Sequence, residues 1–201
     1  MSITLSENGE QLSFYYPTLL AAHSDYLRDH VLIEFGARNS TEPSKKHNIT
    51  TLLAQAVEDS LKLPTALITI LSPIRTFWEK ATLIHVECNR GRLLENPDRL
   101  SRHWYDLAML ANSWVCEESL NQTDVLTNVV QHKTAFFNAS YAYYEECLSK
   151  KFRLIPSEKE QINLAIDFKK MQEAGMFQVS PPQFKEIINT LSSLERQINR
   201  H

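Results

Sequence analysis

The sequence has little glycine: only 4 of its 201 residues, at Gly9, Gly36, Gly91 and Gly175. Walker-type phosphate loops and dinucleotide fingerprints need several glycines within one short turn, where the backbone approaches the phosphates. The scattered positions exclude such a loop. No GxSxG sequence is present either, which excludes the nucleophile turn of the α/β-hydrolases. Any phosphate binding must therefore come from side chains.

Cysteine is also scarce. The three cysteines, Cys88, Cys116 and Cys147, are odd in number, widely spaced and without a CxxC pair. This excludes a disulfide framework and a zinc knuckle, and it favours reduced thiols in a cytoplasm. No apolar run approaches the ~18 residues of a membrane span, and the N-terminus lacks the features of a signal peptide. The sequence predicts a soluble cytoplasmic protein without membrane contacts.

Excess charge of one sign is missing as well. The net charge is −3, with 22% charged and 43% hydrophobic residues, as in ordinary globular proteins. Nothing attracts nucleic acid to the molecule as a whole, so such a contact requires a local basic patch. The length allows one large domain or two small ones and a sizeable core.

The first third of the chain has the pattern of alternating strand and helix. Branched and aromatic residues predict strands at Gln11–Tyr16, His30–Ala37 and Thr65–Leu71. Apolar residues at helical spacing predict a helix around Ile49–Ser60. The polar, proline-containing stretch Asn39–His47 is expected to be a loop.

From Pro73 onward the pattern is helical. Proline suits a first helical turn, because its missing N–H has no partner there, and a second helix is expected over residues 100–111. Ser157 and Glu160 have the spacing of a capping box. Further helices are predicted at Leu120–Val130, Ala135–Ser149, Ser157–Glu173 and Pro182–Arg200. The expected fold class is α+β, with a small sheet unit over residues 1–72 and a helical domain over residues 73–201.

The stretch from Pro73 to Leu110 places arginine, lysine, histidine and aspartate among bulky apolar residues, a pattern that indicates the wall of a polyanion site. Upstream, Glu34 interrupts the apolar run VLIEF. A buried carboxylate there needs a partner and would be one ligand of a magnesium site. The alternative is that Glu34 faces solvent on an edge strand, as half-buried strands allow.

Each charged residue of the stretch has a functional and a simpler interpretation. Lys80 lies at the margin of an apolar face, where its ammonium would contact phosphate. Arg75 with Glu79, and Arg102 with Asp106, have i,i+4 spacing, which also suits plain surface ion pairs worth only ~0.3–0.5 kcal/mol. In the functional interpretation, Arg102 holds Asp106 at the mouth of an anion site.

Two further groups of residues give weaker signals. His85 and His103 lie in no HxxxH or HExxH pattern, so packing or solvent exposure is expected rather than metal binding. A basic cluster is offset in part by Glu95 and Asp98 and predicts a modest RNA or nucleotide-phosphate footprint. The cluster consists of Arg90, Arg92, Arg99 and Arg102.

Four ordered motifs, together with the tail, resemble the AbiEii/AbiGii-type nucleotidyltransferase family, the toxins of bacterial toxin–antitoxin and abortive-infection systems. The motifs are YLRDHVLIEFGARNSTEP, PIRTFWEKATLIHVE, RLSRHWYDLAML and NVVQHKTAFF, and the tail contains IDFKKM, SPPQF and LERQIN. The resemblance covers nearly the whole chain from about Tyr15. It implies a polymerase-β-like core followed by helices, and transfer of nucleotides from a nucleoside triphosphate to an acceptor such as tRNA.

Carried over by motif, the resemblance implies catalytic roles for Glu34, Lys80 and Asp106. Glu34 would hold the third acidic strand position and ligate Mg²⁺, Lys80 would hold the triphosphate, and Asp106 would be the aspartate of the fourth motif. Arg75, Glu79 and Arg102 would support them. Phosphate contacts are expected from Arg75, Lys80, Arg99 and Arg102.

The sequence departs from the family at its start. The family's glycine-rich turn and its acid-x-aspartate strand have no counterpart in Met1–Ser13. One carboxylate cannot hold two magnesium ions, so weak or absent Mg²⁺ binding and poor activity alone are expected. A truncated or split enzyme completed by an N-terminal segment is one hypothesis, and a longer natural chain is another. The third is a non-catalytic module for nucleotide, RNA or a cognate antitoxin. An exposed sheet edge predicts self-association.

Overall fold

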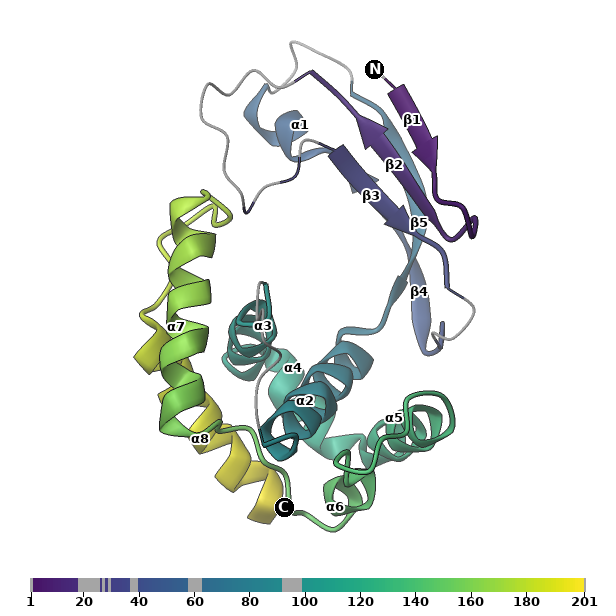
Figure 1. The fold of residues 1–201 in the computed structure, drawn as a ribbon. Coiled ribbons are helices and arrows are strands. Elements are labelled where there is room, and N and C mark those ends of the chain that lie inside the picture. Colours follow the sequence, from purple (N-terminus) through teal and green to yellow (C-terminus); the bar gives the residue numbers. More distant parts are fainter. Residues whose placement is uncertain are drawn as a thin grey trace.

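The fold is mixed helix and sheet, which confirms the predicted α+β class. A computed structural model describes residues 2–17, 26, 28, 30–36, 40–57, 63–91 and 99–200. Figure 1 shows the strands gathered at one end of the molecule and helices α2 to α8 at the other. The last strand ends at Leu71 and the first long helix begins at Pro73.

The first sheet contains β1 (Ser2–Leu5), β2 (Gln11–Tyr15) and β3 (His30–Glu34), antiparallel and in that order. Its register sorts the side chains by polarity, because alternate residues of a strand point to opposite faces. One face carries two apolar rows, Ile3–Phe14–Val31 and Leu5–Leu12–Ile33. The other carries the pairs Gln11–Glu34, Ser13–Leu32 and Tyr15–His30. The sheet therefore has one apolar face and one mostly polar face.

The second sheet pairs β4 (Ser44–Thr50) with β5 (Thr65–Leu71) in antiparallel register. The predicted loop at Asn39–His47 is wrong from Ser44 onward, where β4 begins, and its first residue lies outside the described residues. The predicted helix at Ile49–Ser60 is the shorter α1 (Leu52–Ala56), capped by the Thr51 side chain, and its last predicted residues are not described.

Helix α2 (Pro73–Asn89) is the central helix, in contact with α3, α4, α5 and α6. It begins as the sequence predicts, with Pro73 in the first turn and the Ser72 hydroxyl accepting from the Ile74 N–H at 3.3 Å. Its apolar side chains are buried because other helices pack around it on several sides. Phe77, Ala81 and Ile84 are fully buried.

Four further helices differ in part from the predictions. The structure has α3 (Arg102–Ala111), α4 (Trp114–Asn121), α5 (Thr123–Phe136) and α6 (Tyr144–Leu148). The single helix predicted at Leu120–Val130 is two helices, which break at Gln122. The helix predicted at Ala135–Ser149 is wrong in its centre, because α5 ends at Phe136 and only α6 resumes.

The last two helices follow the sequence closely. Helix α7 (Glu158–Glu173) begins with the predicted capping box, in which Ser157 and Glu160 bond reciprocally. Helix α8 (Phe184–Arg200) buries Ile187, Leu191 and Leu194 and packs against α3. No helix in the described ranges combines the length and the apolar character needed to cross a lipid bilayer.

Candidate functional site

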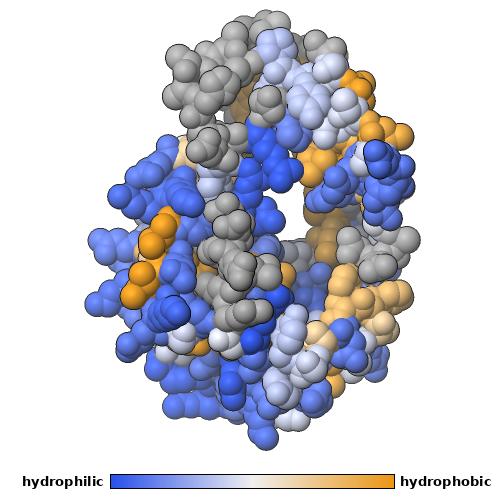
Figure 2. All heavy atoms as spheres, viewed as in Figure 1, coloured by the Kyte–Doolittle hydropathy of each residue, from blue (hydrophilic) through white to orange (hydrophobic). Residues whose placement is uncertain are grey.

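A cleft of ≈ 780 Å³ lies between the polar face of the three-stranded sheet and the region where α3 begins and α7 ends. Figure 2 shows a hollow between the strand-bearing part and the mainly hydrophilic helical part. The sheet contributes Gln11, Ser13, His30, Leu32 and Glu34 to the lining. The polar rows of the sheet therefore form one wall of the cleft, as the register requires.

Among the described residues that line this cleft, Glu34 is the one carboxylate. It ends β3, is exposed, and its Oε1 accepts a hydrogen bond from Gln11 Nε2 at 3.0 Å across the strand pair. Three arginines line the same cleft: Arg28, Arg99 and Arg102. The cleft therefore carries more cationic than anionic side chains, which favours an anionic ligand.

Arg99 and Arg102 enter the cleft from the turn that starts α3. Arg99 has a left-handed backbone with φ 67°, and its guanidinium donates to the Tyr26 carbonyl and lies 5.3 Å from the centre of the Tyr26 ring. Arg102 opens the helix and is exposed. The structure thus brings Glu34, Arg99 and Arg102 together around one cavity. Arg92 of the basic cluster lies outside the described residues.

A buried aspartate that the sequence analysis missed holds this turn in place. Asp167, on α7, is 2% exposed and accepts hydrogen bonds from the Arg99 N–H at 2.8 Å and the Ser101 N–H at 2.9 Å, and also from the Ser101 hydroxyl. A buried carboxylate needs such donors to offset its lost hydration. Its spacing in the sequence could have indicated this burial, because Asp167 shares a helix face with the buried Leu164 and Met171.

Lys80, on α2, forms a network with Asp106 and His103 of α3. Asp106 lies one helical turn beyond Arg102. The Lys80 ammonium donates to Asp106 Oδ2 at 2.7 Å and to His103 Nδ1 at 2.9 Å. Both partners of the ion pair are partly exposed, 22% for Lys80 and 41% for Asp106. Asp106 therefore pairs across two helices with Lys80 rather than along α3 with Arg102.

The histidine of this network is held neutral. Burial lowers the pKa of His103 to about 4, and the nearby cations Lys80 and Arg102 act in the same direction. Neutral imidazole accepts a hydrogen bond at one ring nitrogen, which suits the contact with the Lys80 ammonium. His103 thus orients Lys80 without adding a charge beside it.

Arg75 lies apart from the cleft and is fully buried. Its guanidinium donates to Glu79 Oε1 at 2.9 Å, to the Glu42 carbonyl at 2.8 Å and to Asn128 Oδ1 at 2.6 Å. These bonds tie α2 to α5 and to the residue pair that precedes β4. The remaining Nη2 has no hydrogen-bond partner among the described residues.

The two acidic residues predicted for the site, Glu34 and Asp106, both have protein partners. Among the described residues, no group of three or more His, Cys, Asp or Glu side chains that could hold a metal ion is found. Mg²⁺ takes near-octahedral oxygen ligation with help from carboxylates, whereas Glu34 bonds to Gln11 and Asp106 bonds to Lys80.

Comparison with known families gives one match. Residues 2–190 match the family described as nucleotidyl transferase AbiEii toxin, type IV TA system. No curated protein and no solved structure matches the chain. The matched range contains the cleft, the Lys80 network and Asp167.

Proposed function

Because the chain belongs to the AbiEii nucleotidyltransferase toxin family, we propose that its cleft binds the phosphates of a nucleoside triphosphate for nucleotidyl transfer. The observation that carries this proposal is the pair of arginines at the start of α3, Arg99 and Arg102, facing the cleft wall that ends in Glu34. Guanidinium groups present forked N–H donors that match phosphate oxygens.

In this proposal Lys80 also contacts a phosphate oxygen, although it is not among the described residues that line the cleft. Its ammonium has three N–H donors, of which Asp106 and His103 take two. The third is available to a phosphate oxygen, and the two fixed partners orient it. Because electrostatic stabilisation and positioning supply most of the rate in phosphoryl transfer, a pre-oriented cation is the expected device.

Transfer by this chain alone is expected to be slow or absent. Two-metal chemistry requires several carboxylates to hold the two ions beside the reacting phosphate, and among the described cleft residues only Glu34 is acidic. Acidic residues supplied by another polypeptide segment would complete such a site. tRNA is the proposed acceptor, and the type IV toxin–antitoxin description suggests a cognate antitoxin as partner.

Calorimetric titration with inorganic tripolyphosphate and with nucleoside triphosphates tests the cleft directly. Lys80→Ala and Arg102→Ala should each weaken tripolyphosphate binding at least tenfold, because each removes a cationic contact. Lys159→Ala is the matched control, since Lys159 is an exposed lysine on α7. Unchanged affinity in both variants would contradict phosphate binding at the cleft and at the Lys80 network.

A transfer assay addresses the chemistry separately. The purified chain, Mg²⁺ and a radiolabelled nucleoside triphosphate should leave bulk tRNA unlabelled, or nearly so. Strong labelling of tRNA by the chain alone would contradict the proposal that acidic residues must come from elsewhere.

A binding function without chemistry is the second candidate, favoured by the excess of arginines over carboxylates in the cleft. RNA binding would then fall steeply as salt rises, because contacts between arginine and phosphate release counterions. Arg99→Ala combined with Arg102→Ala should abolish it. Binding that ignores salt would count against this candidate.

A further inference from the structure

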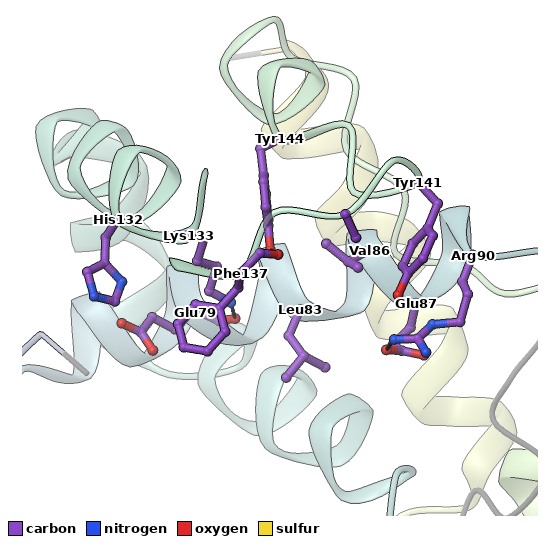
Figure 3. Close-up of a pocket in the computed structure, with 11 residues that line it drawn as sticks. Glu79, Leu83, Val86, Glu87, Arg90, His132, Lys133, Phe137, Tyr141 and Tyr144 are labelled. Atoms are coloured by element: carbon purple, nitrogen blue, oxygen red, sulfur yellow. Dashed lines mark hydrogen bonds and ion pairs between the residues drawn. The ribbon is translucent and has the colours of Figure 1, made fainter. Parts of the chain in front are cut away.

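A second cavity, of ≈ 340 Å³, lies along α2 on the side that faces α5, and none of its lining residues belongs to the cleft. Figure 3 shows Glu79, Leu83 and Glu87 of α2 beneath it, with side chains from the end of α5 and the following loop around it. Its volume is near the lower end of the range for small-molecule sites, which begins at roughly 300 Å³. This suits one nucleotide-sized ligand.

Three side chains that line this cavity carry an unpaired buried polar atom. Glu87 Oε2, Arg90 Nε and His132 Nδ1 are buried without a hydrogen-bond partner among the described residues, and all three side chains line the cavity. Glu87 is only 7% exposed. Leaving such atoms unpaired costs about 1–3 kcal/mol each, so their gathering at one cavity indicates a ligand that pairs with them.

At one end of the cavity, an unpaired hydrogen-bond donor lies beside an unpaired acceptor. Arg90 Nη2 donates to Glu87 Oε1 at 2.7 Å, so this ion pair uses one oxygen and one nitrogen only. The neighbouring Glu87 Oε2 and Arg90 Nε have no hydrogen-bond partner among the described residues. Burial raises the pKa of Glu87, while the Arg90 charge and hydrogen bond oppose that rise. The Watson–Crick edge of a nucleobase offers the complementary pair, one N–H next to one acceptor.

The walls between the two ends are aromatic and aliphatic. Phe137 and Tyr141 line the cavity together with Leu83 and Val86. The Arg90 guanidinium lies 4.9 Å from the centre of the Tyr141 ring, which fixes that ring beside the open donor and acceptor. Bases stack on aromatic side chains and on arginine planes in single-stranded nucleic-acid sites.

The opposite end carries a cation. In Figure 3, Lys133 and His132 lie beside Glu79, away from Arg90. The Lys133 ammonium donates to the Glu79 carbonyl at 2.9 Å and has further N–H donors, and burial lowers its pKa to about 8. From Glu79 to Glu87 the axis of α2 rises about 12 Å, a span comparable to one nucleotide.

We infer that this cavity binds one nucleotide, with its base edge on Glu87 and Arg90, its ring against Phe137 and Tyr141, and its phosphate on Lys133. The inference rests on the proposed function, because it assigns a nucleotide to a nucleotidyltransferase-family chain. The shared chemistry is a nucleobase with an attached phosphate, supplied by a free nucleotide or by an unpaired RNA end.

Titration of cytidine and adenosine into the full chain tests the base end without phosphate. Glu87→Gln should weaken nucleoside binding about tenfold, and Ala139→Phe should abolish it by filling the cavity from its wall. Glu118→Gln, an exposed carboxylate on α4, is the matched control, and circular dichroism checks the fold of each variant. Nuclear Overhauser contacts between base protons and the Phe137 or Tyr141 rings are expected in the wild type.

The phosphate end has its own test. Lys133→Gln should weaken binding of cytidine 5′-monophosphate at least fivefold and leave cytidine binding unchanged. Tighter binding of short single-stranded RNA than of nucleoside triphosphates would identify an RNA end as the source, and the reverse order would identify the free nucleotide.

Failure of this inference and failure of the proposed function give different results. Nucleoside binding that is absent, or that ignores Glu87→Gln and Ala139→Phe, overturns the inference even where tripolyphosphate still binds the cleft. Nucleoside binding that depends on both substitutions supports the inference, even if tripolyphosphate fails to bind and the proposed cleft function is lost.

Discussion

At the residue scale, the most informative contact is the one between Lys80, Asp106 and His103. The ammonium lies between a carboxylate oxygen at 2.7 Å and an imidazole nitrogen at 2.9 Å. Protonation of the imidazole would place a second cation beside Lys80, with Arg102 and Lys133 adding to the repulsion. The network therefore has a built-in sensitivity to acid.

His103 gives a signed pH prediction. Its pKa is about 4 in the folded protein, below the ordinary histidine value of 6.5. A depressed pKa contributes stability that is complete above 6.5 and is lost as pH falls toward 4. Between pH 7 and pH 4.5 the wild type should lose about 2 kcal/mol more unfolding free energy than His103→Gln, after allowance for partial exposure.

Urea denaturation at both pH values measures this difference. Glutamine can still accept from Lys80 but cannot be protonated, so the variant isolates the titration. His47→Gln on β4 is the control, because His47 is exposed. Equal losses in the wild type and His103→Gln would refute the assignment.

At the element scale, the position of α3 depends on α7. Asp167 lies in the interior of α7 and accepts three hydrogen bonds from the turn that carries Arg99 and Ser101. Two helices that are distant in sequence thereby set the direction of the arginines in the cleft. Helix α8 completes this arrangement by packing against α3 from another side.

Asp167→Asn should destabilise the protein by about 2–3 kcal/mol, because hydrogen bonds to a buried charged acceptor are worth more than neutral ones. It should also weaken tripolyphosphate binding, since the turn bearing Arg99 and Arg102 loses its anchor. Thermal or urea unfolding and calorimetry measure the two effects. Glu173→Gln on the same helix, in an exposed ion pair, should change stability by less than about 0.5 kcal/mol. Equal behaviour of the two variants would contradict the anchoring role.

The whole molecule leaves its strand region largely uncovered. The apolar face of the three-stranded sheet carries Ile3, Leu5 and Val31 at 57%, 64% and 53% exposure. Figure 2 shows hydrophobic side chains gathered at the upper right, where the strands lie. Contiguous exposed apolar patches of this kind mark association surfaces.

Light scattering over rising protein concentration should therefore show association. Ile3→Ser combined with Val31→Ser should raise the concentration needed for it at least tenfold, because each buried apolar side chain contributes roughly 1.5–3 kcal/mol. Thr4→Ala, on the polar face of the same strand, is the control. A wild type that stays monomeric at all concentrations would disprove this prediction.

The sequence predicted long, strongly patterned elements well. Helix α8 has an uninterrupted apolar stripe, and α7 has a capping box, so local signals sufficed. Strand β4 was missed because SKKHNIT is polar and exposed on both faces and depends on pairing with β5. The break at Gln122 was missed because apolar residues continue on both sides of it.

Part of the candidate site could also be predicted from the sequence. Glu34, Arg99 and Arg102 were chosen by motif and type, and they lie on one cleft. The partner of Asp106 was not predictable, because Lys80 is 26 residues away and meets it only through the packing of α2 against α3. Asp167 and the cavity beside Lys133 depend on tertiary contacts that no local spacing encodes.

The core is unevenly distributed, and this affects the cooperativity of unfolding. Among the described residues, Tyr26 is the one buried apolar side chain before Phe77, and the rest of the core belongs to the helical part. Strands that bury so little can open while the helices stay folded, since local opening follows local burial. The cleft wall would then disappear below the main melting temperature, and the protein would unfold as two cooperative units, the strands before the helices.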